Sequence, residues 1–236
     1  SGAEVLTIAQ AHEDWVMCVA YSPDGKHIVS CASWDRDPRI RIWDAATGKE
    51  TMNMRTRNRY VSYVSYDRTG KYIVSATGTD NAIDIWDAAS GENVRTLRGH
   101  HGPVWSAAFS PDGSKLVSSG ADKTIKIWDI SSSPGPFFIP TPSRVDTLSF
   151  SPDGRRFVTA DRRGESLILW DAMAGVELRR LIGSWRSYDS AFSPNGQHIA
   201  LAERHHIVRL WDTETGEQGT VFRGHDSHVF SVAYSP

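Results

Sequence analysis

Histidine, serine and aspartate recur together along this chain, and these three residue types can form a hydrolytic triad. The most complete set is His100, Ser118 and Asp122, followed by Trp128. A hydrolase that carries its nucleophile on a sheet scaffold often places that serine in a Gly-x-Ser-x-Gly turn, and no such pentapeptide occurs in the sequence. The triad therefore lacks the turn that would expose its serine, and we predict no catalytic residues.

Metal and phosphate sites are weakly indicated. Glu203, His205 and His206 lie close together in sequence, and His225 precedes His228 by three residues, but no cysteines stand beside them to complete a zinc site. Neither a Walker-type loop nor a Gly-x-Gly-x-x-Gly loop is present. We predict no metal and no cofactor.

Composition and charge exclude further classes of protein. The 26 basic and 28 acidic residues give a net charge of -2, which argues against a nucleic-acid binder. No apolar run approaches the roughly 20 residues that span a bilayer, so we expect no membrane insertion. The opening Ser-Gly-Ala-Glu has no features of a secretory signal, and Cys18 and Cys31 lie in strand-like runs where we expect reduced thiols. An intracellular, cytoplasmic location is the expectation.

The regular spacing of these residues comes from an internal repeat. Within the third copy, four short runs of strand-forming residues are separated by turn residues, which predicts antiparallel hairpins and no helices. These runs are Val104–Phe109, Lys115–Ser119, Ile125–Trp128 and Phe137–Ile139. Trp-Asp dipeptides mark the period, with spacings of 43, 42, 42 and 41 residues, at Trp43, Trp86, Trp128, Trp170 and Trp211.

With a terminal Trp-Asp in each of the five units and a Gly-His lead-in at Gly99-His100 and Gly224-His225, the repeat resembles that of the WD-repeat β-propeller family. The resemblance implies an all-β fold with five complete four-stranded units and partial strands at both ends, in one domain over residues 1–236. The units cover approximately 12–54, 57–97, 100–139, 141–182 and 183–222, with partial segments at 1–11 and 223–236. Prolines in segment 131–141 predict a short or irregular outer strand there.

The two ends of the sequence carry the same stretch. Val-Ala-Tyr-Ser-Pro occurs at 19–23 and again at 232–236, at the same point of the repeat. We therefore expect an incomplete or truncated ring cut from a longer array. A closed ring of five or six blades is the alternative.

In this family a buried network links a loop histidine, a hydroxyl in the second strand, a turn aspartate and the terminal tryptophan. The resemblance therefore gives the recurrent residues a structural role. In the fifth unit we expect Ala200 at the place of the hydroxyl. The other residues carried over are His12, Ser30, Trp43, Ser75, Asp80, Trp86, His100, Ser118, Asp122, Trp128, Thr159, Trp170 and Trp211.

The residues three and five places after the loop histidine face partners in many family members. Carried onto this chain, they place aromatic residues at one rim in four units, and aromatic, Met and Arg side chains are enriched at protein interfaces. The alternative is that the aromatic residues simply begin the first strand and pack inward. The predicted partner-binding residues are Trp15, Met17, Tyr60, Trp105, Arg144, Arg186, Tyr188, His228 and Phe230.

Arginines also gather near this rim, although solvated loops could equally explain them. They favour an acidic or phosphorylated partner, because a guanidinium binds such groups with two hydrogen bonds. The arginines are Arg55, Arg57, Arg59, Arg162, Arg163, Arg186 and Arg204. We predict a non-enzymatic scaffold, in a signalling or sensor context, that binds a protein or peptide. The alternative is an oligomerising module that self-associates through the edges of its unfinished blade.

Overall fold

The computed structural model describes residues 6–32, 38–57, 60–131, 137–141, 144–160, 166–182, 187–203, 205–229 and 231–234. In these ranges the chain forms strands and turns and contains no helix. The strands make five four-stranded sheets, each with its strands in chain order. The predicted all-β fold and its four strands per repeat are confirmed.

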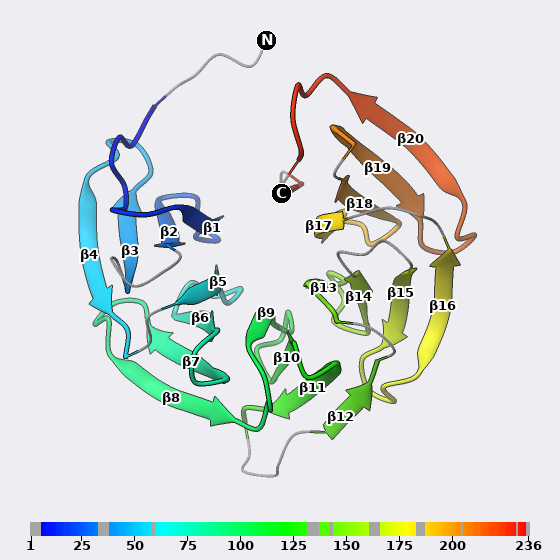
Figure 1. The fold of residues 1–236 in the computed structure, drawn as a ribbon, viewed down its shortest axis with the longest axis horizontal. Helices are drawn as coiled ribbons and strands as arrows, with labels where there is room; N and C mark the ends of the chain where they lie inside the picture. The colour runs from blue at the N-terminus through cyan, green and yellow to red at the C-terminus, as the bar shows by residue number, and fades with distance from the viewer. Residues whose placement is uncertain are drawn as a thin grey trace. The chain divides into compact units, whose positions relative to one another are not determined.

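The chain divides into two compact units, Ser1–Phe109 and Ser110–Pro236. The predicted single domain and the incomplete ring therefore stay predictions. The first unit contains β1 (Val16–Tyr21), β2 (His27–Ala32), β3 (Arg39–Asp44), β4 (Glu50–Arg55), β5 (Val61–Tyr66), β6 (Tyr72–Thr77), β7 (Ala82–Asp87), β8 (Asn93–Arg98) and β9 (Val104–Phe109). Figure 1 shows its first two sheets lying next to one another, and β5 packs against β1 and β2.

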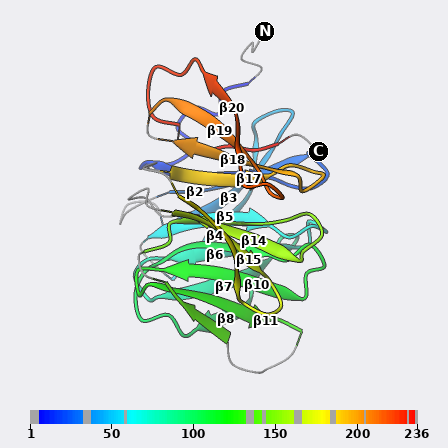
Figure 2. The same ribbon diagram turned by 90° about the vertical axis from the view of Figure 1, so that its right-hand side faces the viewer.

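The second unit begins with the three later strands of the third sheet. Its strands are β10 (Lys115–Gly120), β11 (Thr124–Asp129), β12 (Phe137–Pro140), β13 (Thr147–Phe150), β14 (Arg156–Ala160), β15 (Ser166–Asp171), β16 (Glu177–Ile182), β17 (Ser187–Phe192), β18 (His198–Glu203), β19 (Ile207–Asp212) and β20 (Gln218–Arg223). Figure 2 shows β17 to β20 one above another as a twisted layer. Strand β12 has four residues where β4 and β8 have six, which confirms the short outer strand in the proline-rich segment.

The turn between the first two strands of a sheet is specified by its own residues. At Ser22-Pro23-Asp24-Gly25, the Ser22 hydroxyl donates to Asp24 Oδ1 at 2.6 Å and the Gly25 N–H donates to the Ser22 carbonyl at 2.9 Å. Gly25 has φ 70°, a left-handed conformation that glycine adopts without a steric penalty. The hydrogen bond from Ser22 lowers the pKa of the Asp24 carboxyl below its ordinary value. The same arrangement recurs at Ser110 and Ser151.

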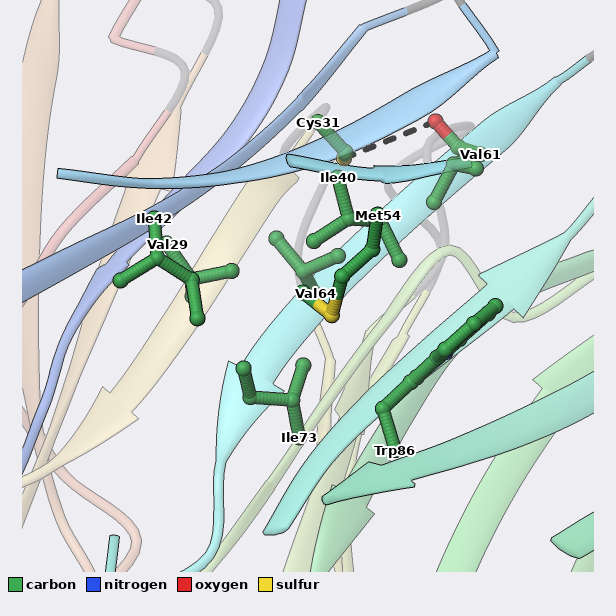
Figure 3. Close-up of a cluster of buried hydrophobic side chains, with 9 residues drawn as sticks. All are labelled: Val29, Cys31, Ile40, Ile42, Met54, Val61, Val64, Ile73 and Trp86. Atoms are coloured by element: carbon green, nitrogen blue, oxygen red, sulfur yellow. Dashed lines mark hydrogen bonds between the residues drawn. The ribbon is translucent and has the colours of Figure 1, made fainter. Parts of the chain in front are cut away.

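The core lies between the faces of consecutive sheets. In the first unit, side chains of β2, β3 and β4 pack against β5, β6 and β7, and Figure 3 shows Met54 and Val64 meeting in this layer. A second cluster joins the fourth and fifth sheets. Its members are Val158, Ala160, Leu167, Leu169, Leu181, Phe192, Ile199, Leu201 and Trp211. Because each sheet buries its apolar face only against a neighbouring sheet, the stacking of repeats supplies the hydrophobic stabilisation.

Candidate interaction surface

The recurrent hydroxyls bind the terminal tryptophans. Trp43 Nε1 donates to Ser30 Oγ at 2.8 Å, and Trp86 Nε1 donates to Ser75 Oγ at 2.9 Å. The corresponding bonds from Trp128 to Ser118 and from Trp170 to Thr159 are each 2.8 Å long. All four hydroxyl residues are at most 2% exposed. A nucleophile at any of these positions would have no access to substrate, so the hydroxyls brace each sheet from within.

The histidine and aspartate positions of this set have different surroundings. His12 Nε2 lies 2.7 Å from Ser30 Oγ, so the first sheet joins a histidine, a serine and a tryptophan. Asp80 accepts hydrogen bonds from Thr77 Oγ1 at 2.5 Å and from Arg98 Nη2 at 3.3 Å.

In the third repeat, His100 is 6% exposed. Asp122 Oδ1 accepts from Thr124 Oγ1 at 2.8 Å. For Asp80 and Asp122, these bonds hold the turn between the second and third strands.

The fifth sheet departs from the pattern at a different residue from the one that the sequence indicated. The ladder pairs Ile199 with Trp211, as it pairs Ile28 with Trp43, and the hydroxyl position two residues later is therefore Leu201. The expectation of Ala200 there is wrong by one residue. Since successive side chains of a strand point to opposite faces, that single residue moves the prediction to the other side of the sheet.

In the first unit, the predicted partner-binding residues differ in their exposure. Trp15 is 77% exposed and Met17 is 40% exposed, at the start of the first sheet. Tyr60 and Trp105 are half-buried, with ring centroids 6.2 Å apart and ring planes at 74°. This edge-to-face contact fixes both rings relative to one another. Trp15 therefore presents an open apolar surface, whereas Tyr60 and Trp105 form a held pair.

Gly78 makes room for the Tyr60 ring. A Cβ at position 78 would lie 2.2 Å from Tyr60 Cδ1 and 2.8 Å from Cε1. The Gly78 N–H also donates to the Tyr60 carbonyl at 3.1 Å. This role of Gly78 is not visible in the sequence, because it depends on how β5 and β6 pair, with Val61 opposite Thr77 and Tyr60 just before it.

In the second unit, the described members of the set are Arg144, Tyr188 and His228. Arg144 forms an ion pair with Asp146, so its guanidinium already has a carboxylate partner. The Tyr188 and His228 rings stack with centroids 6.0 Å apart, and His206 lies 5.5 Å from His228. Arg186 and Phe230 lie outside the described residues.

The arginine cluster is described only in part. Arg55 and Arg57 are exposed. Arg59, Arg162, Arg163 and Arg204 lie outside the described residues, as Arg186 does.

Glu203 takes part in a buried ion pair. It is 0% exposed and accepts from Arg209 Nε at 2.6 Å and from Nη2 at 3.3 Å. Within the described ranges, no group of three or more His, Cys, Asp or Glu residues could hold a metal ion. In the sequence Glu203 stands out only as a candidate metal ligand, although its closeness to the β18–β19 turn indicates a cross-strand partner.

Asp189 is a half-buried carboxylate whose contacts the sequence did not reveal. Its Oδ1 accepts from the Ser190 N–H at 2.8 Å, and its Oδ2 accepts from Ser231 Oγ at 2.7 Å and from the Val232 N–H at 3.1 Å. Burial raises the pKa of this carboxyl above its ordinary value despite these donors.

Comparison with known proteins decides the family. The model of the WD domain, G-beta repeat, matches residues 3–44, 48–87 and 91–129. The chain belongs to the WD-repeat family. Members of this family are generally non-catalytic and serve as interaction scaffolds. In the part of the chain that the structure describes, no helix is long and apolar enough to cross a membrane.

The relatives of this WD-repeat chain are diverse. It is 30% identical over 251 residues to apoptotic protease-activating factor 1 of Rattus norvegicus, covering 98% of this chain and 19% of that protein. It is 26% identical over 249 residues to a guanine nucleotide-binding protein subunit beta of Nicotiana plumbaginifolia, covering 97% of this chain and 65% of the relative. Transcription initiation factor TFIID subunit 5 of Caenorhabditis elegans is 30% identical over 139 residues, which is 58% of this chain and 21% of that subunit. The chain thus spans only about a fifth of two of these relatives.

Proposed function

We propose that this WD-repeat chain is a non-enzymatic, intracellular interaction module that binds a protein or peptide through its aromatic rim. The observation that carries the proposal is the exposure of Trp15, which is 77%, next to a half-exposed Met17. By repeat position, Trp15 is equivalent to Tyr60 and Met17 is equivalent to Trp105. A partner that binds here would bury a large apolar surface of this exposed indole. Trp is also the residue most enriched at binding hot spots.

An acidic or phosphorylated peptide is the preferred partner. Arg57 is exposed and stands three residues before Tyr60 in the first unit. A carboxylate or phosphate on the partner can pair with this guanidinium while an apolar neighbour covers the aromatic rings. In the second unit, the residues that we propose for partner binding are Arg144, Arg186, Tyr188, His228 and Phe230.

A peptide array that holds matched acidic, phosphorylated and neutral sequences tests the proposal. Trp15→Ala is expected to weaken binding of the selected peptide by about 2 kcal/mol, which is about thirtyfold in Kd. Phe138→Ala is the control, because this aromatic side chain is 59% exposed but belongs to an outer strand. The binding surface would lie elsewhere if Trp15→Ala and Phe138→Ala lost the same affinity. It would also lie elsewhere if the double variant Trp15→Ala with Trp105→Ala still bound the peptide.

A second candidate is self-association. It is favoured by apolar side chains at the surface of β1, where Val19 is 56% exposed. Exposed apolar side chains on a sheet face stabilise contacts with another chain.

A further inference from the structure

The two cysteines of the chain lie opposite one another in the first sheet. Cys18 of β1 pairs with Cys31 of β2 in the ladder, and both are reduced. The Ser22 N–H donates to the His27 carbonyl, and the alternation of the ladder from there makes Cys18 and Cys31 a hydrogen-bonded pair. Side chains of directly opposite residues project from the same face of a sheet. The Cα atoms of such a pair are about 5.5 Å apart, which is close to the commonest spacing in disulfides.

Both thiols point into the layer between the first and second sheets. Cys18 Sγ donates to the Val64 carbonyl at 3.3 Å, and Cys31 Sγ donates to the Val61 carbonyl at 3.6 Å. Figure 3 shows the bond from Cys31 among the buried side chains of this layer. Both acceptors belong to β5, so the two thiols face the same strand within the first unit.

The fold does not require sulfur at this place. The same ladder position in the second, fourth and fifth sheets carries alanine on the second strand, opposite a different side chain each time. These pairs are Tyr63 with Ala76, Thr147 with Ala160, and Asp189 with Ala202. The two thiols of the first sheet therefore add a chemistry that packing of the repeat does not need.

We propose that Cys18 and Cys31 form a reversible disulfide that ties β1 to β2. The oxidant that we assign is hydrogen peroxide, a molecule small enough to reach a half-buried thiol. This inference goes beyond the proposed binding function and does not depend on it.

The order of the reaction follows from burial. Cys18 is half-buried, whereas Cys31 is buried and its burial raises the pKa of the Cys31 thiol well above the ordinary value. The thiolate, not the thiol, attacks a peroxide, so Cys18 reacts first. Its sulfur attacks one peroxide oxygen, the O–O bond breaks, and a sulfenic acid and a hydroxide ion form.

Cys31 completes the bond in the second step. Its sulfur attacks the sulfur of Cys18, the S–O bond breaks, and the Cys31 proton leaves with the hydroxyl group as water. The hydroxide of the first step takes up the proton that Cys18 had released. The thiols lose two electrons in total and the peroxide is reduced to two waters. A dithiol reductant reverses the change by thiol–disulfide exchange.

Mass spectrometry of the whole chain tests the bond directly. Trypsin cleaves after Lys26, which lies between the cysteines, so a disulfide holds fragments 1–26 and 27–36 together. We expect this linked pair when the folded, reduced chain is treated with hydrogen peroxide, and its loss on addition of dithiothreitol. Cys18→Ser and Cys31→Ala are the matched variants, since a hydroxyl residue and alanine occupy these positions in the fourth sheet. Neither variant should give the linked pair.

The equilibrium with dithiothreitol measures how far the fold favours the bond. Folding already holds the two ends of the loop 18–31 together, whereas the unfolded chain must close that loop. The equilibrium constant for disulfide formation should therefore be about a hundredfold larger in the folded chain than in urea.

Three results would overturn the inference. Peroxide could convert Cys18 to a sulfinic acid without linking the fragments, which would show that Cys31 does not reach it. Linked fragments from an equal mixture of Cys18→Ser and Cys31→Ala, in the yield of the unmodified chain, would show that the bond forms between chains. An equilibrium constant no larger in the folded chain than in urea would show that the ladder does not favour the disulfide.

Discussion

Gly78→Ala is expected to act through the ring of Tyr60. The new methyl carbon would lie 2.2 Å from Tyr60 Cδ1, 2.8 Å from Cε1 and 3.4 Å from Cγ, so the ring must move. The φ angle of Gly78 is not among the left-handed ones, and the backbone can therefore accept alanine without strain. The cost arises from the side-chain contact alone.

The magnitude follows from three contributions. Forcing an extra methyl group into a packed site costs about 1–3 kcal/mol. Loss of the edge-to-face contact between Tyr60 and Trp105 costs about 0.5–1.5 kcal/mol. Replacing glycine by alanine restricts the unfolded chain, which stabilises the folded state by about 0.4–1 kcal/mol. We therefore expect a loss of about 2 kcal/mol in the free energy of unfolding.

A double-mutant cycle in urea measures this effect. When Tyr60→Ala has removed the ring, Gly78→Ala should be neutral or slightly stabilising. Gly219→Ala is the control, because a Cβ there meets its nearest neighbour, the Leu210 carbonyl oxygen, at an ordinary 3.6 Å. An equal loss from Gly78→Ala with and without the Tyr60 ring would refute this account of the site.

Three further changes test the buried polar groups. Glu203→Ala should lower the free energy of unfolding by about 3–5 kcal/mol, because it leaves Arg209 buried without its carboxylate. Glu203→Leu combined with Arg209→Met should be close to neutral in urea denaturation. A double variant as unstable as the single one would contradict this. Ser118→Ala should cost about 1–3 kcal/mol by removing the acceptor of Trp128 Nε1, and an unchanged unfolding midpoint would count against that bond. Burial raises the pKa of Asp189, so the folded chain holds this proton more strongly than the unfolded chain does, and the Asp189 contribution to stability falls as pH rises from about 4. Asp189→Asn should remove that fall, and an identical pH dependence of the difference between variant and parent would show that the carboxyl is not the cause.

The repeat and its turns were predictable because each depends on residues close in sequence. The Trp-Asp spacing and the Ser-Pro-Asp-Gly turns specify hairpins locally, and the sheets follow them. The short β12 was likewise predictable, since proline cannot donate to a ladder.

The features that the sequence did not reveal depend on register or on approach across sheets. Leu201 takes the hydroxyl position that we had assigned to Ala200, because counting along the chain does not fix the pairing of two strands. The contact of Gly78 with Tyr60 likewise depends on register, because both residues directly extend the pairing of Val61 with Thr77. The contacts of Asp189 with Ser231 and Val232 join residues 42 and 43 positions apart in the chain.

The paired glycine turns of the first sheet also bear on how the chain folds. In the first sheet, Gly25 and Gly48 both have φ 70°, one between β1 and β2 and the other between β3 and β4. Two reversals of this repeat are thus closed over a few residues, and contacts between neighbours in sequence form quickly. A chain of this kind can build its hairpins as it leaves the ribosome and bury each sheet when the next one is complete. Synthesis from the N-terminus would then leave the last finished sheet open for the time needed to make about one repeat.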